Sequence, residues 1–171
     1  MLSEKMIKSL ARQMNREIYS AYFYLGMSSY ATEADLAGVA NWFLVQVQEE
    51  LSHAQKFYNY IQQQGGRVIL EAIEEPPQDF SSVTDLFKKT LEHEKKVTAM
   101  INDLVSQALD EKDRTTELFL QWFVAEQVEE EANATDILQK IKLVGKDGNR
   151  LLMIDNEFGQ RVFTPPAAPA K

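Results

Sequence analysis

Residues 121–133, QWFVAEQVEEEAN, begin like the buried face of a helix and then become acidic. Steps of three or four residues through this region join apolar positions, as is typical of the helix face that packs against a core. Two polar residues interrupt this apolar stripe in its middle. The full stripe is Phe119, Phe123, Gln127, Glu130, Ala134, Ile137 and Ile141. The sequence therefore directs an amide and a carboxylate toward a protein core.

Three other segments have the same periodicity and the same polar interruption. The four helices are expected over residues 3–31, 35–64, 82–110 and 113–143. KDGNRLLMIDNEF supports a short fifth helix over 147–158, and we expect the Pro/Ala-rich tail 164–171 to be loose. The three further stripes are Ile7, Leu10, Met14, Glu17, Ala21 and Tyr24; Val39, Phe43, Gln46, Glu50, His53 and Phe57; and Phe87, Thr90, Glu94, Val97 and Ile101.

The lengths of the connections predict the topology. Helices of about thirty residues are roughly 45 Å long, so the brief breaks near residues 33 and 112 must join antiparallel neighbours. The connection from Gly65 to Phe80 can extend about 50 Å, which is enough to return along the bundle and make the third helix parallel to the second. We therefore predict an all-α fold: a four-helix bundle with one long crossover loop and a short fifth C-terminal helix. A chain of 171 residues fits a single domain over 1–171.

The composition excludes several classes of function. The formal net charge of -8 argues against nucleic-acid binding, which needs a basic surface. No signal sequence and no apolar run of membrane-spanning length is evident, so we expect no membrane association and a cytoplasmic location. The absence of cysteine excludes disulfides, thiolate metal sites and iron–sulfur clusters.

The polar residues in the middle of the stripes should meet at one height, because the helices are similar in length and lie side by side. Their spacing repeats: Glu17 to Glu50 is 50 − 17 = 33 residues and Glu94 to Gln127 is 127 − 94 = 33, with His53 and Glu130 each three residues further on. An alternative register aligns NWF at 41–43 with QWF at 121–123. The first register keeps Glu50 and His53 level with Glu17, and Gln127 and Glu130 level with Glu94, on the partner helix of each hairpin.

A cluster of buried carboxylates needs a compensating positive charge, since each ionised group costs several kcal/mol to desolvate. None of the four stripes has a Lys or Arg at this level, so divalent cations are the expected partners. The i, i+3 pair Glu50 and His53 presents two ligands on one helix face, and carboxylates can bridge two ions. Oxygen-rich ligation with one imidazole favours iron, with manganese second, over zinc or calcium. An isolated ExxH would more often be a solvated surface pair; the convergence of four stripes favours the metal site.

Four segments resemble the non-haem ferritins of bacteria and archaea: NREIYSAYFYL (15–25), NWFLVQVQEELSHAQKFYNYI (41–61), EHEKKVT (92–98) and FLQWFVAEQVEEEA (119–132). The resemblance implies a dinuclear ferroxidase centre with Glu17, Glu50 and His53 around one iron, and with Glu50 bridging to a second iron held by Glu94 and Glu130. Gln127 would hydrogen-bond to nearby ligands or bound oxygen species. The resemblance further implies a third iron site at Glu49, Glu126 and Glu129, and a role for Tyr24 in electron transfer to oxygen.

The resemblance also implies a function. Fe(II) would be oxidised by dioxygen or hydrogen peroxide, and Fe(III) would be stored as a mineral inside a homo-oligomeric shell of 24 subunits. No haem is expected, because Leu51 stands where the haem-containing bacterioferritins have Met and the second half has QxxE instead of ExxH. The predicted fifth helix separates the chain from the DNA-protecting mini-ferritins, and the lack of Cys separates it from rubrerythrins.

Two other classes of function stay open at this point. One is a different di-metal oxidoreductase using manganese or iron, such as a manganese catalase-like enzyme. The other is a non-catalytic helical bundle with a hydrated polar layer. His93 points about 100° away from Glu94 on the same helix, so we expect it at the surface, and we expect Trp122 to serve in packing.

Overall fold

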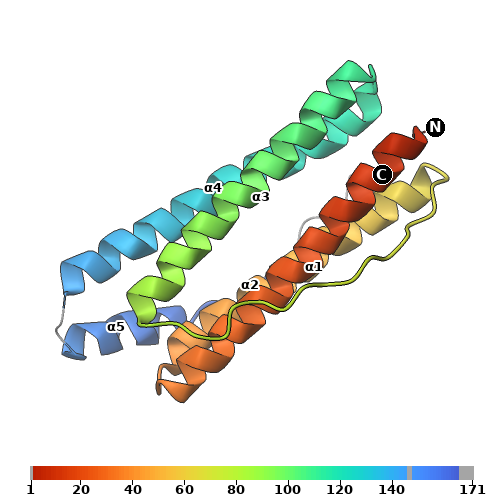
Figure 1. Ribbon diagram of the computed structural model, residues 1–171. Helices are drawn as coiled ribbons and strands as arrows, with labels where there is room; N and C mark the ends of the chain where they lie inside the picture. Colours follow the sequence, from red (N-terminus) through yellow and green to blue (C-terminus); the bar gives the residue numbers. More distant parts are fainter. Residues whose placement is uncertain (1, 146–147, 166–171) are drawn as a thin grey trace.

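The computed structural model describes residues 2–145 and 148–165, and this part of the chain contains five helices and no strand (Figure 1). The predicted all-α bundle with a long crossover and a short fifth helix is confirmed. Two antiparallel pairs, α1 with α2 and α3 with α4, lie side by side, and α3 runs parallel to α2. The predicted loose tail lies beyond the described residues from 166 onward. The helices are α1 (Glu4–Glu33), α2 (Ala37–Gln63), α3 (Val83–Asp110), α4 (Arg114–Val144) and α5 (Gly148–Phe158).

Local hydrogen bonds explain where most of the helices begin and end. The Ser3 side chain accepts a hydrogen bond from the Met6 amide at the start of α1, and Asp113 caps α4 in the same way. At the end of α2, Gly65 has a φ of 78° and the next amide, of Gly66, donates to the Ile61 carbonyl at 2.9 Å. This Schellman arrangement favours glycine and turns the chain into the crossover.

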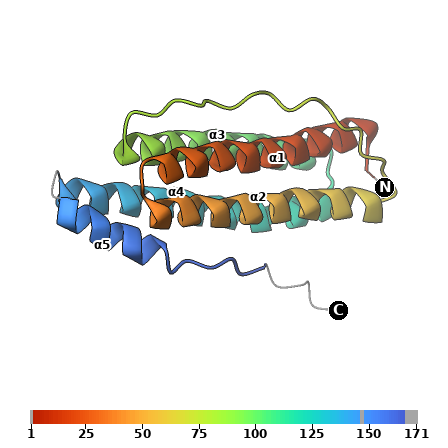
Figure 2. The same cartoon turned by 90° about the horizontal axis from the view of Figure 1, so that it is seen from below.

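The start of α2 has no side-chain cap of its own and receives one from α5. Leu36 occupies the cap position, and the Asp155 carboxylate accepts a hydrogen bond from the Val39 amide at 2.8 Å. A Cβ atom on Gly38 would lie 1.6 Å from the Asp155 carbonyl oxygen, so the two helices approach this closely only with glycine here. This contact fixes α5 across the start of α2, on the face of the bundle opposite the crossover (Figure 2).

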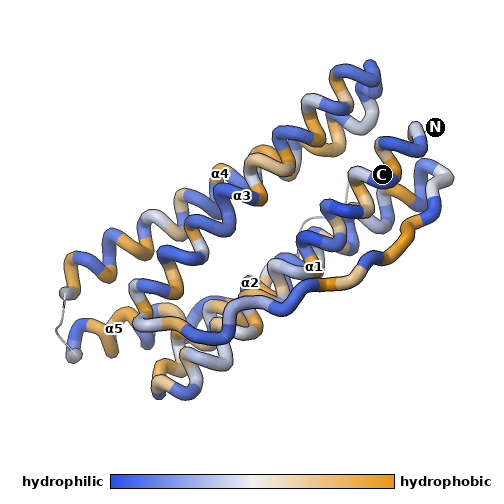
Figure 3. The backbone as a smooth tube through the Cα atoms, viewed as in Figure 1, coloured by the Kyte–Doolittle hydropathy of each residue, from blue (hydrophilic) through white to orange (hydrophobic). Residues whose placement is uncertain are grey.

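The crossover runs along the outside of α1 (Figure 2). Arg12 and Arg16 of α1 form ion pairs with Glu71 and Glu74 of the crossover, and the Asn15 amide donates to the Ala72 carbonyl. Apolar residues near the beginning of this segment remain on the surface (Figure 3). None of the helices in the described ranges is apolar over a length that could cross a membrane.

The bundle interior contains two apolar clusters with polar residues between them. One cluster includes Phe43 and Phe87 and lies toward α5. The other includes Leu10 and Phe57 and lies toward the N-terminal end of α1. Most of the buried polar residues come from the middle parts of the four long helices, so the fold encloses a polar layer between the two apolar clusters.

Candidate metal centre

Each long helix contributes a carboxylate to the polar layer. Glu17, Glu50, Glu94 and Glu130 are at most 6% exposed, and His53 is 3% exposed. Their burial follows from the sequence pattern, because each occupies a core position of its helix at nearly the same height. The layer therefore holds four acidic groups in a low-dielectric interior.

Glu17, Glu50 and His53 are the most closely grouped of the possible ligands. One donor atom from each lies within 4.8 Å of the other two, and no other group of this kind occurs in the described ranges. His53 Nδ1 lies 3.5 Å from a Glu50 oxygen and 3.9 Å from a Glu17 oxygen. Two ligand atoms that each lie about 2.2 Å from one ion are at most about 4.4 Å apart, so a small contraction would complete a metal site.

Glu94 and Glu130 face the same layer and are held by neutral donors. The Tyr24 hydroxyl donates to one Glu94 oxygen, and the Gln127 amide donates to the other at 3.1 Å. The Gln46 amide donates to Glu130 at 3.1 Å. These bonds orient both carboxylates toward the centre and leave lone pairs for a second ion.

The imidazole of His53 is fixed by aromatic rings and by a further carboxylate. Trp122 and Phe123 pack edge-on against it, with ring centroids 5.4 and 6.1 Å away. Its Nε2 lies 3.9 Å from a Glu126 oxygen, on the side away from Glu17 and Glu50. A carboxylate near the second ring nitrogen helps to orient a ligating histidine.

The electrostatics of the layer favour protonated acids when no cation is bound. Burial, followed by the charge of Glu50, raises the pKa of Glu17 well above its usual range. Burial, followed by the charges of Glu94 and Glu130, does the same to the pKa of Glu50. Burial and the charge of Glu94 raise the pKa of Glu130 to about 8. A divalent ion would replace these protons, since metal ligands bind deprotonated.

The structure does not gather the three residues expected at a third iron site. Glu126 lies beside His53, and Glu49 interacts electrostatically with both of these residues. Glu49 is paired instead with Arg161, whose Nη2 donates to it at 2.7 Å. Glu129 is exposed on α4. The expectation that no basic residue reaches this level holds for the four stripes but misses Arg161, which arrives from beyond α5.

His93 is half-buried against α1, where a fully exposed surface position was expected. Its ring contacts Phe23 at a centroid distance of 4.7 Å and Tyr24 at 5.9 Å, and one ring nitrogen lies 2.8 Å from the Ser20 hydroxyl. Burial lowers the pKa of His93 to about 4, so the imidazole is neutral. Helix α1 covers this flank of α3, and the sequence of α3 alone could not show it. Trp122 packs against His53 and Phe123, as expected of a packing residue.

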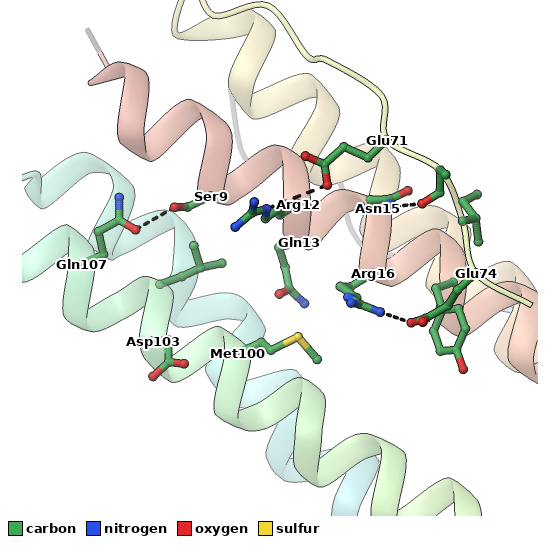
Figure 4. Close-up of a pocket in the computed structure, with 14 residues that line it drawn as sticks. Ser9, Arg12, Gln13, Asn15, Arg16, Glu71, Glu74, Met100, Asp103 and Gln107 are labelled. Atoms are coloured by element: carbon green, nitrogen blue, oxygen red, sulfur yellow. Dashed lines mark hydrogen bonds and ion pairs between the residues drawn. The ribbon is translucent and has the colours of Figure 1, made fainter. Parts of the chain in front are cut away.

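A surface cavity of about 460 Å³ approaches the layer from the crossover side (Figure 4). It lies between α1, α3 and the crossover, and its lining includes Gln13 and Asp103. The Gln13 amide donates to Glu17 at 2.8 Å. The Gln13 side chain therefore connects the cavity to the buried Glu17 carboxylate. Arg12 and Arg16, which form ion pairs with the crossover, flank the cavity.

A four-helix bundle with a carboxylate from each helix and an ExxH pair is the architecture of di-metal carboxylate proteins. Comparison with known proteins identifies the family within this class. The ferritin-like domain family matches residues 7–144, and the chain belongs to this family.

Individual relatives are similar over almost the whole chain. A bacterial non-haem ferritin of Campylobacter jejuni is 43% identical over 91% of this chain and 93% of its own length. A probable non-haem ferritin-like protein of Haemophilus influenzae is 40% identical over 93% of this chain and 96% of its own. The open-pore ferritin of the archaeon Archaeoglobus fulgidus is 51% identical with a TM-score of 0.93, covering 95% of this chain and all of that one.

Proposed function

We propose that this protein is a non-haem ferritin that oxidises Fe(II) at the buried carboxylate layer and stores the resulting Fe(III) as a mineral inside a hollow homo-oligomer. The observation that carries the proposal is the grouping of Glu17, Glu50 and His53 within 4.8 Å in the buried interior. Family membership supports iron storage and ferroxidase activity. Within the family, a non-catalytic bundle does not account for ligands from all four helices.

In the proposed mechanism two Fe(II) ions are the substrates. Glu17, Glu50 and His53 bind one, and Glu94 and Glu130 bind the other, with Glu50 between them. Two Fe(II) supply two electrons, and dioxygen with two protons accepts them to give hydrogen peroxide and two Fe(III). Iron binding displaces protons from Glu17 and Glu50, whose pKa values are raised, and these can be the two protons that dioxygen takes up. Gln127 keeps Glu94 oriented throughout by its amide bond.

Surface features support assembly into a shell. Tyr22 and Leu25 on α1 are close to half exposed, and two apolar residues of the crossover are more exposed still, at 61% for Ile69 and 73% for Leu70. Contiguous exposed apolar residues mark protein interfaces. We propose a shell of 24 subunits in the cytoplasm, and the net charge of -8 per chain would concentrate cations around it.

Aerobic loading with iron tests the proposal. Fe(II) is added to metal-free protein in stoichiometric steps, and the absorbance of Fe(III) is followed before size-exclusion chromatography with iron detection. We expect rapid oxidation of the first two ions per chain and iron that co-elutes with a large oligomer. A chain that elutes as a monomer without iron would refute the storage function. Protein loaded with manganese in place of iron should not dismute hydrogen peroxide, which separates this function from that of a manganese catalase-like enzyme.

Tyr24 is proposed to support the electron transfer to oxygen. It is fully buried, and its hydroxyl donates to Glu94. Tyr24→Phe keeps the ring and removes the hydroxyl, so we expect oxidation slowed by about tenfold with little loss of anaerobic Fe(II) binding. Stopped-flow absorbance and calorimetry measure the two quantities. If binding falls as much as the rate does, the tyrosine only orients Glu94.

A further inference from the structure

Arg161 lies at the edge of the metal centre although it follows α5 in the chain. Its Nη2 donates to Gln46 Oε1 at 2.6 Å and to Glu49 Oε2 at 2.7 Å. Its Nη1 donates to the Trp42 carbonyl at 3.3 Å, and the guanidinium stacks 4.5 Å from the centre of the Trp42 ring. Four contacts on α2 therefore hold one positive charge in place.

Two of those contacts lead to residues of the iron centre. Glu49 is one of the three acids expected at the third iron site. Gln46 receives the guanidinium on its carbonyl oxygen and donates from its amide nitrogen to Glu130 at 3.1 Å. A single side chain thus connects Arg161 to a ligand expected for the second iron.

We propose that Arg161 is a built-in competitor for iron at Glu49 and sets how tightly the third site holds a cation. The inference rests on the proposed ferritin function. A charge-assisted bond of 2.7 Å occupies the carboxylate oxygen that a metal ion would need. The guanidinium and a metal ion repel each other at such separations, so cation binding at Glu49 is weakened while Arg161 stays in place. Glu49 therefore binds iron more tightly once the Arg161 side chain has moved away.

The structure has room for that movement. Arg161 borders a cavity of about 450 Å³ between α4, α5 and Trp42, and Asp136 and Glu157 also line this cavity. The Asn41 amide donates to the backbone carbonyl of Arg161 at 2.9 Å. The backbone can therefore stay in place while the guanidinium turns from Glu49 toward the carboxylates of the cavity.

The test uses Zn²⁺, which cannot be oxidised, titrated by calorimetry into metal-free full-length protein. The variants are Arg161→Gln, Glu49→Gln and the double variant. We expect Arg161→Gln to bind the ion beyond the two buried ones about tenfold more tightly than the wild type, since it frees a charged hydrogen-bond acceptor. This gain should vanish in the double variant. Arg161→Lys, which keeps the charge but loses the planar fork, should give an intermediate affinity.

Arg114→Gln is the matched control, because Arg114 pairs with Glu117 at 2.6 Å on the exposed start of α4, away from the metal centre. It should bind Zn²⁺ as the wild type does. Circular dichroism and elution volume establish that each variant is folded and assembled. The alternative is that Arg161 only fastens the C-terminal segment to α2. Arg161→Gln would then leave the affinity of the third site for Zn²⁺ unchanged or lower, or a gain in that affinity would persist in the double variant. Each of these results overturns the proposal.

Failure of the underlying function has a different signature. The two buried ions are measured separately, as the tight phase, and His53→Ala should remove one of the two ions from it. If that phase is missing from the wild type, the proposed ferroxidase centre is wrong and the competition at Glu49 falls with it. If the tight phase is present and only the third ion is insensitive to Arg161, the centre stands and the competition alone is refuted.

Discussion

Glu50→Ala should slow the aerobic oxidation of Fe(II) by about a hundredfold or more, because it removes a ligand from both halves of the centre. Glu50 lies 3.5 Å from His53 and interacts electrostatically with Glu94 and Glu130 as well as Glu17. Glu50 therefore has neighbours in both proposed iron positions. His53→Ala should lower the rate similarly by emptying one of the two positions.

The rate is measured by stopped flow with two Fe(II) per chain. Glu92→Ala is the control, since Glu92 is an exposed carboxylate of α3, and it should react at the wild-type rate. The helical content of Glu50→Ala should not change, because the apolar clusters on either side of the layer are untouched. An unchanged oxidation rate in folded Glu50→Ala would show that the chemistry occurs elsewhere.

The metal-free protein should lose stability as the pH rises from about 6.5 to 8. Glu130 has a folded pKa of about 8, far above the unfolded value of 4.5, so the folded state keeps a proton that the unfolded state has lost. Stability of this origin is complete below the unfolded pKa and disappears as the pH passes the folded one. Each fully protonated group contributes a loss of about 1.4 kcal/mol per pH unit, and the raised pKa values of Glu17 and Glu50 act in the same direction.

The window from pH 6.5 to pH 8 separates the effect of the buried carboxyl groups from that of His93. The depressed pKa of His93, about 4, gives the opposite slope, but only below the unfolded value of 6.5. Unfolding by guanidinium at pH 6.5 and pH 8 therefore reports the carboxyls. Zn²⁺ should abolish the loss, because it binds the ionised form, and Glu130→Gln should flatten the slope without metal. A metal-free protein equally stable at both pH values would contradict the buried, protonated layer.

Much of the candidate centre could be predicted before the structure, for a local reason. A residue on a core stripe of a long helix faces inward whichever helix covers it, so Glu17, Glu50, Glu94 and Glu130 are recognisable from spacing alone. The roles assigned to them in iron chemistry remain proposals. The predicted second helix, 35–64, begins two residues later at Ala37, where α5 and not a local side chain supplies the cap.

The amino-acid order by itself determined the four amphipathic helices, the long crossover and the polar interruption of every stripe, because hydrophobic periodicity depends only on the repeat of the backbone. The tertiary structure alone decided what surrounds them: Arg161 reaches Glu49 across 112 residues, Asp155 caps α2 across 116, and α1 packs against His93. Such contacts depend on how whole helices dock. Docking brings together side chains that are far apart in the sequence, and the residues next to each side chain do not indicate which partner it will meet.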